Sequence, residues 1–304
     1  MRGNAASTIA SLIFADKHRA PYFQSVLRQV VSDPDISVRV CAAEALTAML
    51  NHDRDTAVQL FLELCDTQED LLLGTPPVER FLHYALQSHF EQLKPVLNRM
   101  LNSDLSEVAE AGARNSCCIS LVIEQAKPLA DHCLSGHEGH RLAAAEVFAN
   151  NIRSAHFRQE CKDALILLFN DPDEKVRAQS AKCFFDMEGE ELSKYLDLVN
   201  QFISSAAFLN SFHDLIWAME RTTARLPEII CMMCDRYITD LLEENSRNGK
   251  AFRTDINLIC KLLMTSYSQS SKQPELQSQC LNLIDRLAVI GLYDLDKVLE
   301  EYER

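Results

Sequence analysis

Residues that break or end helices are scarce in this chain. Only 8 Gly and 9 Pro occur among its 304 residues, too few for a protein rich in hairpins and tight turns. Ala, Leu, Glu, Gln and Arg, which favour helices, occur instead in long runs. Hydrophobic residues make up 47% of the chain and charged residues 24%, which excludes a chain that is disordered throughout. The composition therefore predicts an all-α fold.

Basic residues are also in short supply. The chain has 30 Lys and Arg against 44 Asp and Glu, a net charge of −14. The deficit is even, because residues 1–152 carry 12 basic and 19 acidic side chains and residues 153–304 carry 18 and 25. A protein that grips nucleic acid needs a basic face to displace counterions from phosphates. The sequence therefore disfavours a nucleic-acid partner.

Long apolar runs and familiar catalytic motifs are missing too. No apolar run reaches the roughly 20 residues that a membrane-spanning helix needs, so we expect no membrane partner. The phosphate-binding GxxxxGK[ST] loop, the nucleophile elbow and the zinc-protease motif are all absent from the sequence. We therefore predict a protein that is not itself an enzyme and that carries no cofactor.

The 11 cysteines follow no disulfide framework. Their number is odd and most lie inside apolar helical segments, which favours free thiols and a reducing, cytoplasmic location. Cys231 and Cys234 have the C-x-x-C spacing, but no second pair lies nearby and both share a helical face with Ile230 and Ile238. We expect these two thiols to pack in the core.

Two further groups of residues could carry chemistry. His132, Cys133, His137 and His140 straddle an expected turn at residues 135–136, but their spacing matches no standard structural zinc site. We expect a polar turn there and no metal. The single tryptophan, Trp217, is predicted to be a core residue.

A repeated pattern is the main feature of the sequence. Residues 32–46 and 170–184 each carry Asp-Pro-Asp, then a Val-Arg pair, then Ala five residues after the Val. We expect the first Asp to cap a helix and the Pro to occupy its first turn. Counted from the Val of the Val-Arg pair, the two clear copies start at residues 38 and 176, and weaker copies start at 78, 108 and 140. Successive starts are therefore 40, 30, 32 and 36 residues apart, the scale of a helix-pair repeat. The expected signature residues are Asp33, Val38, Arg39, Ala43, Asp171, Val176, Arg177 and Ala181.

Each patterned helix is preceded by another apolar segment, which we expect to be the first helix of the pair. These first helices are predicted over residues 22–31, 57–65, 93–101, 126–134 and 161–169. Helical periodicity continues after residue 190 without the Asp-Pro and Val-Arg marks.

The pattern resembles the HEAT-repeat family, in which Asp and Arg near the start of the second helix recur from repeat to repeat. The resemblance is best at 33–50 and 171–186. It implies a right-handed α-solenoid of about seven helix pairs, whose curvature makes a long concave surface. We expect regular repeats over residues 1–190 and degenerate repeats over 191–304. The alternative is a non-repetitive helical bundle.

The two ends of the chain carry further expectations. Arg2, Ala6 and Ile9 align with Arg39, Ala43 and Leu46, which suggests a start in mid-repeat with more protein before it. The alternative is a native capping helix over residues 2–14. A polar loop is expected over 243–250. The end, residues 281–304, reads as a terminal cap and resembles the ends of large prokaryotic NTPases with helical-repeat tails, which act in sensing and defence.

These patterns favour a protein-interaction or sensor scaffold, whose partner is another protein or the rest of a larger polypeptide. Arg39 and Arg177 are expected to pair with acids of neighbouring repeats. The expected partner contacts are Arg141, Glu146 and Lys182. The alternative is a nucleic-acid-binding or base-modifying HEAT-fold enzyme, resembling HEAT-fold DNA glycosylases. It would need Arg39, Arg141, Arg177 and Lys182 to line one basic stripe.

Overall fold

The computed structural model describes residues 2–67, 69–248 and 256–289. Throughout these residues the chain forms α-helices and short 3-10 helices, and the one strand-like feature is an isolated bridge between Gly189 and Thr222. The predicted all-α class is therefore confirmed. The chain divides into two compact units, Met1–Val147 and Phe148–Arg304. None of the described helices is both long enough and apolar enough to cross a bilayer.

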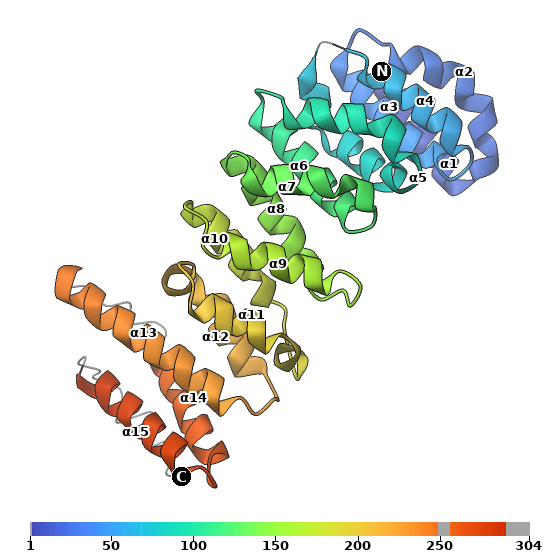
Figure 1. Ribbon diagram of the computed structural model, residues 1–304. Helices are drawn as coiled ribbons and strands as arrows, with labels where there is room; N and C mark the ends of the chain where they lie inside the picture. Colours follow the sequence, from blue (N-terminus) through green and yellow to red (C-terminus); the bar gives the residue numbers. More distant parts are fainter. Residues whose placement is uncertain (1, 68, 249–255, 290–304) are drawn as a thin grey trace. The chain divides into compact units, whose positions relative to one another are not determined.

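The first unit is built from helices that pack on others one or two places away along the chain (Figure 1). They are α1 (Arg2–Ala15), α2 (Ala20–Val31), α3 (Ile36–Met49), α4 (Arg54–Cys65), α5 (Pro76–Leu101), α6 (Ser106–Ser120) and α7 (Lys127–Ser135), and α8 (Glu138–Asn151) continues into the second unit. Within the unit, α3 packs against α1, α2, α4 and α5, and α6 packs against α5 and α7.

The long helix α5 contains two of the predicted helices. His89, with φ −133° and ψ 35°, leaves the helical range inside it. The first arm of α5 includes Val78, and the second arm holds the predicted 93–101 segment and packs on α6. Predicted helices 22–31, 57–65, 126–134 and 161–169 likewise match α2, α4, α7 and α9 to within a few residues.

The second unit contains α9 (Arg158–Leu168), α10 (Glu174–Ala181), α11 (Leu196–Ile203), α12 (Phe208–Arg221), α13 (Pro227–Asn248), α14 (Ile256–Gln269) and α15 (Pro274–Val289). Phe202 lies at the centre of its aromatic core, with ring centroids 5.1 Å from Phe169, 5.0 Å from Phe184 and 5.8 Å from Phe208. Helices α13, α14 and α15 pack against one another.

The patterned valines and alanines lie where the pattern predicts. Val38, Val108 and Val176 are each the third residue of their helix and are buried. Ala43 and Ala181 are fully buried. Gly112, next to Ala113 in α6, shows why small residues are needed, because an added Cβ there would lie 2.7 Å from Cβ of Met100 in α5. The two helices therefore cross almost backbone to backbone.

The prediction that the first Asp caps the helix and that Pro lies in its first turn is wrong. Asp35 is the N-cap of α3 and accepts a hydrogen bond from the Ser37 amide at 2.9 Å, and Asp173 does the same for α10. The first Asp instead accepts from the amide of the second, at 2.9 Å for Asp33 and 2.8 Å for Asp171. The second Asp itself keeps extended backbone angles, φ −86° and ψ 117° at Asp35 and φ −89° and ψ 129° at Asp173, so each helix begins only after it.

Two other expectations need correction. Trp217 is 49% exposed, because α12 buries the face that carries Phe212, Leu215 and Met219 and turns Trp217 away from it. The backbone of α13 stays helical to Asn248, so most of the predicted polar loop over 243–250 is helix. Residues 281–289 of the predicted terminal cap belong to α15, and residues 249–250 and 290–304 lie outside the described residues.

Candidate functional site

The signature arginines Arg39 and Arg177, and Arg141 at the same position of a weaker copy, make contacts within the chain. Arg39 is 8% exposed and pairs with Glu69 at 2.5 Å. Arg177 donates from Nη1 to the carbonyl oxygens of Asp171, at 2.7 Å, and Pro172, at 3.1 Å. Arg141 donates from Nη1 to the Gly136 carbonyl at 2.6 Å. Arg141 and Arg177 thus tie the second helix to the turn before it, which is a structural use for each side chain. A partner contact by Arg141 stays a prediction.

One position of the repeat points away from the core. The sixth residue after each pattern start is partly or largely exposed, and these residues are Glu44, Tyr84, Arg114, Glu146 and Lys182.

Three of the charged side chains at this sixth position contact polar groups of their own unit. Arg114 donates from Nε to Glu79 at 2.6 Å and lies 4.0 Å from Glu146. The hydrogen bond to Glu79 is the main reason that the pKa of Arg114 is raised. In the second unit, Lys182 donates to Gln179 at 2.7 Å, and its charge opposes the rise in the pKa of Asp214 that burial causes. The predicted contacts Glu146 and Lys182 therefore each lie beside charged or polar side chains of their own unit.

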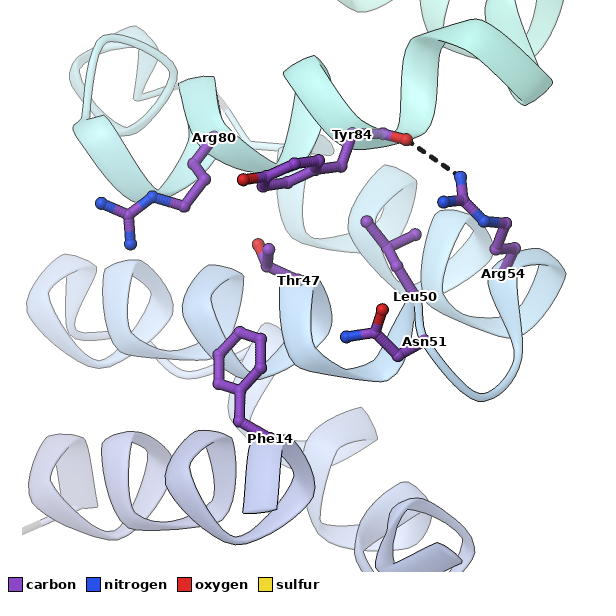
Figure 2. Close-up of a pocket in the computed structure, with 7 residues that line it drawn as sticks. All are labelled: Phe14, Thr47, Leu50, Asn51, Arg54, Arg80 and Tyr84. Atoms are coloured by element: carbon purple, nitrogen blue, oxygen red, sulfur yellow. Dashed lines mark hydrogen bonds between the residues drawn. The ribbon is translucent and has the colours of Figure 1, made fainter. Parts of the chain in front are cut away.

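The first unit also holds a pocket of about 480 Å³, lined by the ends of α1 and α3, the start of α4 and the first arm of α5. Figure 2 shows Phe14 and Tyr84 on either side of Thr47. The rings belong to different helices and are 55% and 53% exposed, whereas Thr47 and Leu50 are buried. The lining residues are Phe14, Thr47, Leu50, Asn51, Arg54, Arg80 and Tyr84.

Two arginines make this pocket positively charged. Nη1 of Arg54 donates to the carbonyl of Tyr84 at 2.9 Å and to Oγ of Ser88 at 3.1 Å, which fixes the guanidinium beside the pocket (Figure 2). Arg80 is exposed and has no hydrogen bond or ion pair within the part of the chain that the structure describes. Across those same residues, neither arginine has a carboxylate partner.

The second unit displays a separate aromatic patch. Phe185 and Trp217 are 47% and 49% exposed. Arg221 donates to the carbonyl of each, at 3.3 Å for Trp217, and its guanidinium carbon lies 6.0 Å from the centroid of the Phe185 ring. Aromatic side chains beside an arginine are the residue types enriched at interaction hot spots.

The histidine cluster is a packed turn. His140 is 2% exposed, and its ring centroid lies 3.6 Å from that of His137 and 5.7 Å from that of His132. Burial, with the nearby His137 and His132, lowers the pKa of His140 to about 4. Among the described residues, no group of three His, Cys, Asp or Glu side chains is arranged to hold a metal ion.

The C-x-x-C cysteines are buried on α13, and Cys231 Sγ lies 3.3 Å from Cys280 Sγ of α15. Burial raises the pKa of both Cys231 and Cys234, which disfavours the reactive thiolate.

Comparison with known proteins assigns no role to these features. Neither a family model nor a curated protein matches the chain. The candidate site therefore rests on its geometry. Sequence reasoning missed Phe14, Arg80 and Tyr84. The available signal was Tyr84, an aromatic residue at the position where other repeats place a charge.

Proposed function

We propose that this chain is a protein-interaction or sensor scaffold of HEAT-like helix pairs, arranged as a right-handed α-solenoid of about seven pairs. It would act in the cytoplasm as part of a larger protein, such as a prokaryotic sensor or defence NTPase. The observation that carries the proposal is the exposed sixth position of the second helices, where charges of both signs alternate and Tyr84 interrupts them. Mixed charge steers protein partners and sets their specificity more than it sets affinity.

The base-modifying or nucleic-acid-binding alternative gains no support from the arginines. Its basic stripe needs Arg39, yet Arg39 is 8% exposed and neutralised by Glu69. Arg177 and Arg141 donate hydrogen bonds to backbone carbonyls of the turns before their own helices. These three arginines therefore do not support a continuous basic groove, which phosphate binding requires.

The interaction surface is tested by charge reversal. The full chain and its Glu146→Lys and Lys182→Glu variants are used as bait in the source-cell lysate. Arg28→Glu is the control, because Arg28 is exposed on α2, a helix without the repeated pattern. We expect a protein that the wild type and the control capture equally and that the two variants lose, with melting temperatures unchanged. Equal capture by all four baits would contradict this surface.

The solenoid is tested by small-angle scattering. A compact chain of 304 residues has a radius of gyration of about 19 Å. An extended array of repeats must exceed this value clearly, whereas a value near 19 Å would favour a compact bundle.

A further inference from the structure

From its walls and its charge, we infer that the pocket between α1, α3 and α5 binds an acidic peptide segment of a partner protein, with one bulky apolar or aromatic side chain held between Phe14 and Tyr84 and neighbouring carboxylates bound by Arg54 and Arg80. This inference rests on the proposed function and names the ligand class of one site.

The aromatic walls define where the anchor side chain sits. Phe14 and Tyr84 keep 55% and 53% of their surface exposed, although both would gain by burial against an apolar group. They flank Thr47 from different repeats, and the buried Leu50 adds an apolar floor (Figure 2). A volume of about 480 Å³ lies in the usual range for ligand pockets and holds one large side chain with its neighbours.

The arginines define the charge of the ligand. The chain as a whole is acidic, with 44 acidic and 30 basic residues. This pocket differs from the chain's overall charge, because it has two arginines that lack a carboxylate partner among the described residues. Arg54 is already oriented by the Tyr84 carbonyl and Ser88, so less entropy is lost when it binds. Guanidinium groups match carboxylates through paired hydrogen bonds. Carboxylate is therefore the complementary group.

A peptide fits this pocket better than a single-stranded nucleic acid. A nucleobase could stack on the two rings, but strand binding also needs a positive groove that follows successive phosphates. The 12 basic and 19 acidic residues in 1–152 provide a negative surround instead. A peptide needs only local complementarity, because charges beyond about 8 Å are largely screened at physiological salt.

The test is a selection followed by matched variants. The full chain is panned against a phage-displayed library of random short peptides, and the best peptide is measured by fluorescence anisotropy. We expect selected sequences in which Phe, Trp, Tyr or Leu stands beside Asp or Glu. Tyr84→Ala and Arg80→Glu are each expected to weaken binding about tenfold or more, as hot-spot truncations do.

The control variants make the same two kinds of substitution, Tyr to Ala and Arg to Glu, outside the pocket. Tyr22→Ala and Arg28→Glu change exposed residues of α2 that do not line the pocket, so both should bind like the wild type. Melting curves report folding, and since Tyr84 and Arg80 are exposed, their variants should melt with the wild type.

Four results would overturn the inference. Basic selected peptides would contradict the charge argument. Selected peptides whose affinity is equal in all variants would place binding elsewhere on the chain, for example at Phe185 and Trp217, and leave the scaffold function standing. Direct binding of labelled oligo-dT to the wild type, lost in the Tyr84→Ala variant, would assign the pocket to nucleic acid. Failure to select any peptide would overturn the pocket inference alone, because the lysate test with Glu146→Lys and Lys182→Glu decides the scaffold function separately.

Discussion

Replacing Gly112 by alanine gives a direct test of the repeat packing. Gly112 lies in the middle of α6, where Ala is normally favoured over Gly by about 1 kcal/mol. Here the added Cβ would lie 2.7 Å from Cβ of Met100 and 3.1 Å from the backbone nitrogen of Leu101. Real side chains do not make a contact that short, and the Leu101 backbone cannot turn aside as a flexible side chain can. Either α5 and α6 separate or the backbone bends.

The two effects oppose each other, and their sizes decide the sign. Overpacking of a well-packed interface costs about 1–3 kcal/mol, and the helix preference returns up to about 1 kcal/mol. We therefore expect Gly112→Ala to lower the free energy of unfolding by ~1 kcal/mol. Gly112→Val adds two more methyl groups to the same contact and should cost ~3 kcal/mol or more.

Differential scanning calorimetry measures the effect, since about 1 kcal/mol shifts the melting temperature by roughly 2–8 °C for domains of this size range. Gly139→Ala in α8 is the matched control, because its Cβ would meet side-chain atoms alone, those of the flexible Glu110 at 3.2 Å and Cε1 of His137 at 3.4 Å, an ordinary contact distance. This control should melt at or above the wild-type temperature. If Gly112→Ala melts as high as Gly139→Ala, the close crossing of α5 and α6 is refuted.

Three further predictions follow from burial. The folded pKa of His140, about 4, lies below its unfolded value near 6.5, so its contribution to stability is complete above pH 6.5 and is lost as the pH falls toward 4. Wild type should lose about 2 kcal/mol more than His140→Leu between pH 7 and pH 5 in denaturant titrations, and parallel pH profiles would count against this. Ala181→Leu should cost ~1–3 kcal/mol while Ala178→Leu, at a half-buried site of α10, should change the melting temperature little; an unshifted Ala181→Leu would mean that the repeat register is wrong. Nine of the 11 cysteines are buried, and burial raises the pKa of Cys65 to about 12 and of Cys260 to about 11. A thiol reagent at neutral pH should therefore modify at most Cys41 and Cys118 before the protein unfolds. Rapid reaction of more thiols would contradict the packing.

The repeat could be predicted because it combines several constraints at fixed spacing. A helix that packs closely against its neighbour needs a small residue at the crossing, and Ala43 and Ala181 occupy that place in their helices. The caps were harder, because Asp-Pro-Asp offers two carboxylates and spacing alone does not decide between them. Backbone angles decide: Asp35 has φ −86° and ψ 117°, extended values that suit an N-cap.

Errors arose where a residue type was weighed without its place on a helix. Trp217 was predicted to be a core residue, yet three residues of α12 nearby, Leu215, Ile216 and Ala218, already fill the buried face. The stretch after residue 242 was assigned to a loop by its polarity. It contains no Gly or Pro before Gly249, so nothing in its composition prevents the helix from continuing to Asn248.

The pocket lies beyond such local reasoning, because its walls come from α1, α3 and α5 and its residues occupy different positions of their repeats. A repeat pattern identifies the positions that are alike, and these mostly build the core. Function more often depends on the positions that differ. Tyr84 stands where the other patterned helices carry Glu44, Arg114, Glu146 and Lys182. This difference places an aromatic ring across Thr47 from Phe14 (Figure 2). The departure from the repeat, rather than the repeat itself, marks the residue most worth mutating first.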